Sequence, residues 1–135
     1  MAPAEAFDLS LSVAAHLASM ARSRERTIGP VRSDAMGLGD EVTWGAWHLG
    51  MPLRLTSRIA ELDRPRRFVD EQVRGPFHRF RHEHLFEPFE SGTRMKDIVE
   101  FEARAGWIGR VAERLVLASY IRHLIDQRNR YLANQ

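Results

Sequence analysis

The feature that most constrains the fold is a change of hydrophobic period after Asp40. From there to about residue 103, apolar and polar side chains alternate along five segments, 41–49, 51–61, 67–74, 77–87 and 93–103. Alternation with a period of two indicates strands that bury one face and expose the other. Short stretches rich in Gly, Pro, Asp and Ser separate several of the segments and are typical of turns. The sequence therefore predicts one curved antiparallel sheet.

A long amphipathic helix is predicted after the last strand, over about 107–132. Roughly 25 residues give a rod of about 38 Å, which is long enough to cross the sheet. Its broad apolar face comprises Val111, Leu115, Ala118, Ile121, Leu124 and Ile125. Residues 3–21 are also expected to be helical, in one or two pieces, and a short strand is expected near 27–32. The predicted fold class is α+β, a single domain over 1–135 with the sheet wrapped on the C-terminal helix.

The composition restricts the classes of function. The absence of cysteine excludes disulfides, a thiol nucleophile and cysteine-ligated zinc. All basic residues except Lys96 are Arg, so a net charge of only +2 already gives a pI of 9.6, and this pI does not indicate a nucleic-acid partner. No apolar run reaches the roughly 18 residues of a membrane span, and the N-terminus has no signal-peptide pattern. We therefore expect a cytoplasmic protein without stable membrane insertion.

Polar side chains are predicted on the buried face of the sheet. In the segment 77–87, Arg79, Arg81 and Glu83 share one face, which must be solvated, so the histidines between them point inward. The same parity applied to the other strands adds carboxylates, an amide and an indole. The inward-facing polar and aromatic set is Trp44, His48, Phe68, Asp70, Gln72, His78, Phe80, His82, His84, Phe86 and Asp97. Several polar groups are thus expected to meet inside.

Three interpretations of this buried polar set stay open. It could be a structural network in which Asp97 and Asp70 accept hydrogen bonds from histidines and from Trp44. It could line a cavity and orient a mostly apolar ligand. It could bind a metal, because His82 and His84 share a face and could chelate with His48 or Asp97. No Glu-x-x-His motif or Asp-rich loop supports the third interpretation, so neither a metal nor another cofactor is expected.

Catalytic motifs are few. A buried His–Asp pair could act as a general base. No Ser or Thr stands in a nucleophile-elbow context, and the glycines between Gly29 and Gly39 do not follow the order of a dinucleotide-binding loop. The sequence therefore assigns no catalytic residue.

A series of short motifs resembles a known superfamily. The motifs are Gly39-Asp40-Glu41-Val42-Thr43-Trp44, His48-Leu49-Gly50, Pro65-Arg66-Arg67-Phe68-Val69-Asp70-Glu71-Gln72, Gly75-Pro76-Phe77, His82-Glu83-His84, Phe86-Glu87, Gly92-Thr93 and Asp97. Together they resemble the SRPBCC superfamily, the START-like, helix-grip group that includes the birch pollen allergen, polyketide cyclases and steroidogenic lipid-transfer domains. The similarity is greatest to small bacterial single-domain members and covers nearly the whole chain.

This resemblance implies a deep cavity between the sheet and the C-terminal helix. The implied function is binding of a small hydrophobic ligand that is lipid-, polyketide- or isoprenoid-like. Two alternatives stay open, a polyketide cyclase/aromatase-like enzyme that uses a buried His–Asp pair, and a protein-interaction module with a filled core and an exposed apolar patch. The candidate ligand-binding residues are Trp44, His48, Asp70, Gln72, Phe80, His82, His84, Phe86 and Asp97.

The chain departs from the superfamily pattern at its start. Relatives have a strand before the helix that matches Ala2 to Phe7, and this strand lies beside the last strand of the sheet. Here Met1 directly precedes the helix. Without that strand, the backbone along Asp97 to Phe101 would form an exposed sheet edge, through which two chains could associate. We expect that the true start codon lies upstream, or that a partner chain supplies the edge.

Overall fold

The computed structural model describes residues 1–20, 24–31, 33–48, 51–102 and 111–135, without the side chains of 48, 51 and 111–117. Six strands form one antiparallel sheet in sequence order. They are β1 (Arg26–Ile28), β2 (Glu41–His48), β3 (Met51–Asp63), β4 (Arg67–Arg74), β5 (Arg79–Phe89) and β6 (Gly92–Glu102). The helices are α1 (Pro3–Ser10), α2 (Val13–Ser19) and α3 (Val111–Ala133). The predicted α+β class and the five main strands are confirmed.

The strand predicted at 77–87 is displaced by two residues, to 79–89. The reason lies in the turn before it. The side-chain amide of Gln72 donates to the backbone carbonyl of Phe77 at 2.8 Å, and its oxygen accepts from the Phe77 backbone N–H at 3.2 Å. These two bonds replace the pairing that Phe77 would have made in a strand, because its backbone groups are already satisfied.

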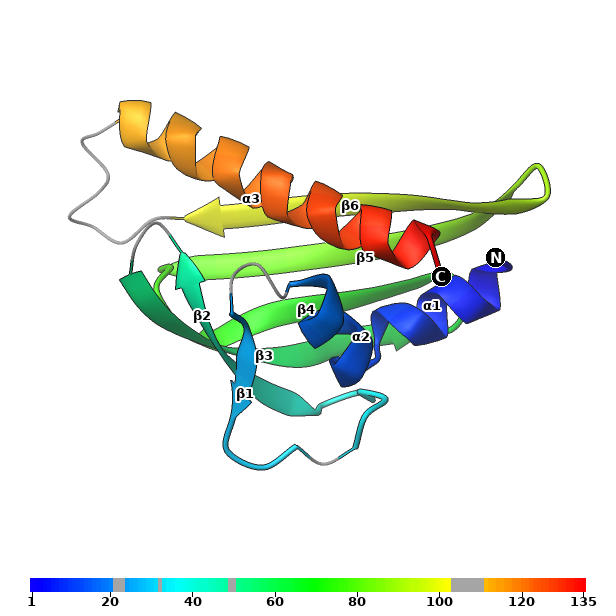
Figure 1. Ribbon diagram of the computed structural model, residues 1–135, viewed down its shortest axis with the longest axis horizontal. Coiled ribbons are helices and arrows are strands. Elements are labelled where there is room, and N and C mark those ends of the chain that lie inside the picture. The colour runs from blue at the N-terminus through cyan, green and yellow to red at the C-terminus, as the bar shows by residue number, and fades with distance from the viewer. Residues whose placement is uncertain (21–23, 32, 49–50, 103–110) are drawn as a thin grey trace.

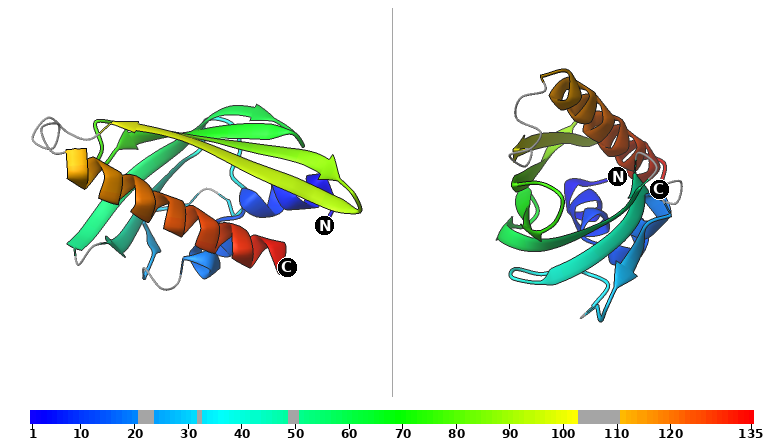
Figure 2. Two further views of the ribbon diagram at one scale, coloured as in Figure 1. Left: turned by 90° about the horizontal axis from the view of Figure 1, so that it is seen from above. Right: turned by 90° about the vertical axis from the view of Figure 1, so that its left-hand side faces the viewer.

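The sheet curves around the helices. Figure 2 shows the strands curled around α1 and α2, with α3 running along the remaining open side. A register shift between Ile59 and Glu61 interrupts the pairing of β3 with β4, and such irregularities bend a sheet. Two helices lie within the range 3–21 that was predicted to be helical in one or two pieces, and Figure 1 shows α3 running alongside β5 and β6.

An aromatic core fills part of the concave face. Phe7 on α1 is 1% exposed and contacts Phe68 and Phe86 edge to face, with ring centroids 5.5 and 5.4 Å apart. Such pairs add about 0.5–1.5 kcal/mol to the energy of burial. A surface ion pair also ties α1 to the sheet, because Arg64 binds both oxygens of Asp8, at 2.9 and 2.6 Å.

The strand β6 lies at one edge of the sheet, as the sequence predicts. In the described part of the chain no strand pairs with the outer side of β6. Association of two chains through this edge stays a prediction.

None of the helices that the structure describes is long and apolar enough to cross a membrane.

Candidate ligand-binding cavity

A cavity of about 310 Å³ lies between the concave face of the sheet and the helices α2 and α3. Most side chains that line it are apolar, among them Trp44, Ala46, Leu55, Phe77, Phe80 and Leu124. Ligand sites in proteins have volumes of about 300–1,000 Å³ and combine an apolar wall with a few polar groups. The volume and the wall of this cavity therefore suit a small apolar molecule.

The order of residues along β5 positions the site. Successive inward-facing side chains of the strand are Phe80, His82, His84 and Phe86. Phe80 lines the cavity, the two histidines form its polar wall, and Phe86 packs in the core against Phe7. The strand thus passes from cavity to polar cluster to core within seven residues, because alternate side chains point to the same face.

Five of the sequence-predicted site residues line the cavity, namely Trp44, Asp70, Phe80, His82 and His84. Three others are not among the residues that line it. Gln72 holds the turn at Phe77, Phe86 belongs to the core, and Asp97 lies behind His82 as its hydrogen-bond partner. The side chain of His48, the ninth, lies outside the described residues.

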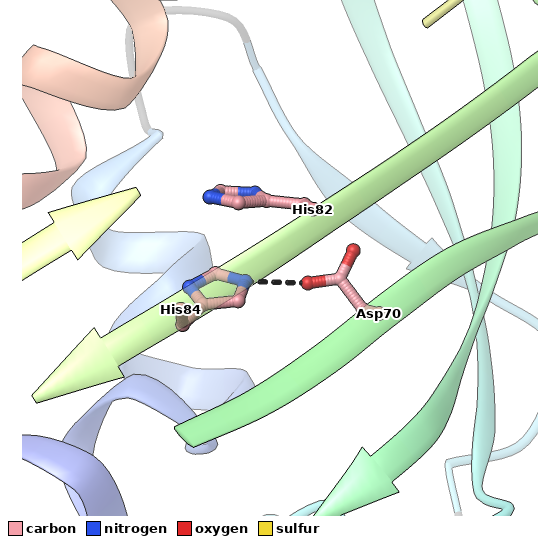
Figure 3. Close-up of side chains that lie close together, drawn as sticks. All are labelled: Asp70, His82 and His84. Carbon is pink, nitrogen blue, oxygen red and sulfur yellow. Dashed lines mark hydrogen bonds and ion pairs between the residues drawn. The ribbon is translucent and has the colours of Figure 1, made fainter. Parts of the chain in front are cut away.

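Each histidine of the polar wall is hydrogen-bonded to a carboxylate, and Figure 3 shows one of the two pairs, His84 with Asp70, beside His82. His84 Nε2 lies 2.6 Å from Asp70 Oδ2, and His82 Nε2 lies 2.7 Å from Asp97 Oδ1. The imidazoles stack with centroids 3.7 Å apart, and the other face of the His84 ring stacks on Phe68 at 4.1 Å. The predicted hydrogen bonds from the histidines to these two carboxylates are confirmed.

The helix α3 adds two polar residues that the sequence analysis missed. Asn129 Nδ2 donates to Asp97 Oδ2 at 2.5 Å. Arg128 is 6% exposed, and its Nη2 lies 3.3 Å from His84 Nδ1, while Nη1 lies 3.6 Å from Asp97 Oδ1. The sequence spacing could have indicated that Arg128 faces inward, because it follows Leu124 by four residues and so lies on the apolar face of the helix.

The protonation states follow from burial and charge. Burial lowers the pKa of His84 to about 3, and the positive charge of the Arg128 guanidinium acts in the same direction. The neutral ring carries its hydrogen on Nε2, which donates to Asp70, so that Nδ1 can accept from Arg128. Burial by itself would raise the pKa of Asp97, but the hydrogen bond from His82 and the charge of Arg128 hold it well below its ordinary value. Burial acts on Asp70 in the same direction, but the hydrogen bond from His84 outweighs it and lowers the pKa of that carboxyl.

This cluster does not have the geometry of a metal site. Asp70, His82 and His84 each offer a donor atom within 4.8 Å of the others, and Asp97 Oδ1 also lies 2.7 Å from His82 Nε2 and 3.5 Å from His84 Nδ1. A histidine nitrogen directs its lone pair in the plane of the ring, and two rings inclined by only 23° and stacked at 3.7 Å cannot both aim at one ion. The guanidinium of Arg128 also places a positive charge beside His84.

A second polar pair borders the cavity. Ser12 caps α2 by accepting from the backbone N–H of Ala15, and His16 follows one turn later. His16 Nε2 lies 2.5 Å from Glu25 Oε1, and its ring contacts Trp44 at 4.3 Å between centroids. The sequence analysis missed this pair.

The indole of Trp44 does not bind a carboxylate as the network interpretation expected. Its Nε1 donates to Ser57 Oγ at 3.0 Å. In the register of β2 and β3, Trp44 lies opposite Leu55 and Ser57 lies two residues further along its strand. The nearer hydroxyl on the neighbouring strand therefore satisfies the indole N–H, and Asp70 is left to His84.

Comparison with known proteins confirms the fold. No protein-family model matches the sequence, and no curated protein matches it. The solved structure of TTHA0849 from Thermus thermophilus is similar, with 17% identity over 98% of this chain and 90% of that one and a TM-score of 0.75. Ara h 8.0201 has 14% identity over 100% and 92% of the two chains, with a TM-score of 0.68. CV1439 from Chromobacterium violaceum has 15% identity over 98% and 88%, with a TM-score of 0.66. The chain has the helix-grip fold that its resemblance to the SRPBCC superfamily implied.

Proposed function

We propose that this protein binds a small hydrophobic molecule, lipid-, polyketide- or isoprenoid-like, in the cavity between the sheet and α3. The observation that carries the proposal is the cavity itself, about 310 Å³ in volume, with an apolar wall and a few clustered polar side chains. The fold neighbours show the same architecture and support this choice only at the level of the fold.

The proposal is tested with N-phenyl-1-naphthylamine, a neutral dye that fluoresces strongly only in apolar surroundings. The purified full chain is expected to bind one dye molecule, with a Kd in roughly the micromolar range for a ligand of this size. The measurement is a fluorescence titration with a stoichiometry determination. Absence of saturable binding of this dye would contradict the proposal.

A matched pair of variants locates the dye. Ala46 lines the cavity and is 7% exposed, so Ala46→Leu adds three carbon atoms to the binding space. We expect this substitution to weaken dye binding at least about tenfold, because overfilling a packed site costs on the order of 1–3 kcal/mol. Val73 is 40% exposed, and Val73→Leu is expected to leave binding unchanged. Equal dye affinity of the two folded variants would place the dye elsewhere.

A second candidate function is cyclase-like catalysis. It is favoured by one observation, that His82 is oriented by a carboxylate 2.7 Å away while its ring borders the cavity. A general base so held could remove a proton next to a ketone carbonyl. Deuterium incorporation into 2-tetralone in D₂O is then expected to be about 10²-fold or more faster with the wild type than with His82→Ala. Equal exchange rates would rule out His82 as the base.

A protein-interaction function receives less support. It calls for a filled core and a contiguous exposed apolar patch. Among the large exposed apolar side chains, Leu38 lies in the loop before β2, Trp47 on β2 and Phe89 at the end of β5. A cavity of about 310 Å³ does not fit the filled core that this function calls for.

A further inference from the structure

One nitrogen of His82 is available to a ligand. His82 is 7% exposed, and its Nε2 is occupied by Asp97 at 2.7 Å. Among the described residues, no group forms a hydrogen bond with its Nδ1. In that same part of the chain, no fully buried polar side-chain atom lacks a partner. Nδ1 must therefore reach open space, which for this residue is the cavity that it lines.

The partners of His82 decide what this nitrogen can do. Asp97 is ionised and accepts hydrogen bonds from His82 and from Asn129. Because the Asp97 carboxylate can only accept, the hydrogen of the His82 ring lies on Nε2, and Nδ1 is the nitrogen that presents a lone pair to the cavity. A ligand group placed there must donate a hydrogen bond, because a second acceptor would leave Nδ1 unsatisfied.

The charge of the polar wall restricts the ligand further. The carboxylates of Asp70 and Asp97 and the guanidinium of Arg128 together carry one net negative charge. All three side chains are largely removed from solvent, with exposures of 22%, 11% and 8%. An anionic group brought into this low-dielectric region would add a second uncompensated negative charge. A neutral donor adds none.

We propose that the ligand carries a hydroxyl group on its apolar skeleton, an alcohol or a phenol, which donates to His82 Nδ1, and that the site rejects carboxylates of the same shape. This inference rests on the proposed function, because it names the chemistry of the ligand that occupies the same cavity. The stack of Phe68, His84 and His82 holds the accepting ring in place.

Three compounds of nearly equal shape test the inference: 2-naphthol, 2-methylnaphthalene and 2-naphthoate. Each competes with N-phenyl-1-naphthylamine for the wild type at about pH 7.5, where the phenol and imidazoles are ordinarily neutral and the carboxylate is charged. The naphthol is expected to displace the dye at about tenfold lower concentration than the methyl compound, the gain of one well-placed hydrogen bond. The naphthoate is expected to need at least about tenfold more than the naphthol.

A pair of histidine variants assigns the effect to one residue. His82→Phe keeps a ring against His84 and removes the acceptor, so the naphthol should lose its advantage over the methyl compound. His78 is exposed, and His78→Phe should retain that advantage. If His82→Phe does not fold, the wild-type series alone decides.

The possible outcomes separate the two proposals. Equal displacement by all three compounds, or tightest binding of the naphthoate, would overturn the hydroxyl inference while cavity binding stands. Retention of the naphthol preference in folded His82→Phe would also overturn it. Failure of the dye itself to bind would overturn the proposed function.

Discussion

Replacing Arg128 with Met is expected to lower the free energy of unfolding by about 3–5 kcal/mol. Met keeps the apolar part of the side chain and removes the guanidinium, which lies 3.6 Å from Asp97 Oδ1 and 3.3 Å from His84 Nδ1. The two buried carboxylates then lack a nearby fixed positive charge. Removing one partner of a buried ionic group is costly because the remaining charge stays out of water. Urea unfolding of the two proteins measures the difference.

Two further variants make this prediction specific. Arg130 is exposed on the same helix, and Arg130→Met is expected to change stability by less than about 0.5 kcal/mol. Adding Asp97→Asn to Arg128→Met removes one of the uncompensated charges and should recover about 1 kcal/mol or more. If Arg128→Met is as stable as Arg130→Met, the guanidinium does not stabilise the cluster as described.

The second large effect is a loss of stability in mild acid. The pKa of His84 is lowered from its ordinary 6.5 to about 3 in the folded protein. Below about pH 6.5 the unfolded chain takes up a proton that the folded chain does not, so folding becomes less favourable as the pH falls towards 3. The slope reaches about 1.4 kcal/mol per pH unit, or about 2 kcal/mol between pH 6.5 and pH 5. Urea unfolding at a series of pH values measures it.

A histidine control isolates this effect. Asp70 and Asp97 also have lowered pKa values, but their stabilising effect is lost only as the pH falls below about 4. The interval from about pH 6.5 to pH 5 therefore reports mainly on histidine. His84→Gln should flatten the slope there, whereas His123→Gln, at an exposed position of α3, should leave it unchanged. A slope that survives His84→Gln would contradict the assignment.

Strand periodicity was enough to predict most of the fold and part of the site. On a strand, parity alone decides which side chains share a face, so the inward positions of His82, His84, Asp70 and Asp97 could be read from the sequence. Parity does not decide how far along the strand the cavity extends. Phe86 and Phe80 have the same parity, yet Phe7 on α1 fills the space beside Phe86 and leaves the space beside Phe80 open.

The contributions of the helices were harder to predict. Arg128 has the spacing of the apolar face of α3, but a charged residue in such a position is ordinarily assigned to solvent. Its burial is explained by the carboxylates that face it from the sheet. Gln72 is a different case. Parity assigned its side chain to the inward face, and that side chain forms two hydrogen bonds with the backbone of Phe77 in the turn before β5. Both depend on tertiary contacts that no local pattern contains.

The most direct test of ligand binding in this cavity is an NMR measurement of intermolecular NOEs between N-phenyl-1-naphthylamine and the methyl groups of the protein. The account predicts NOEs to Ala46, Ile121 and Leu124, which line the cavity. It predicts none to Leu62 and Val73, which are 37% and 40% exposed. NOEs from saturating dye to those two residues, with none to the cavity methyls, would contradict it.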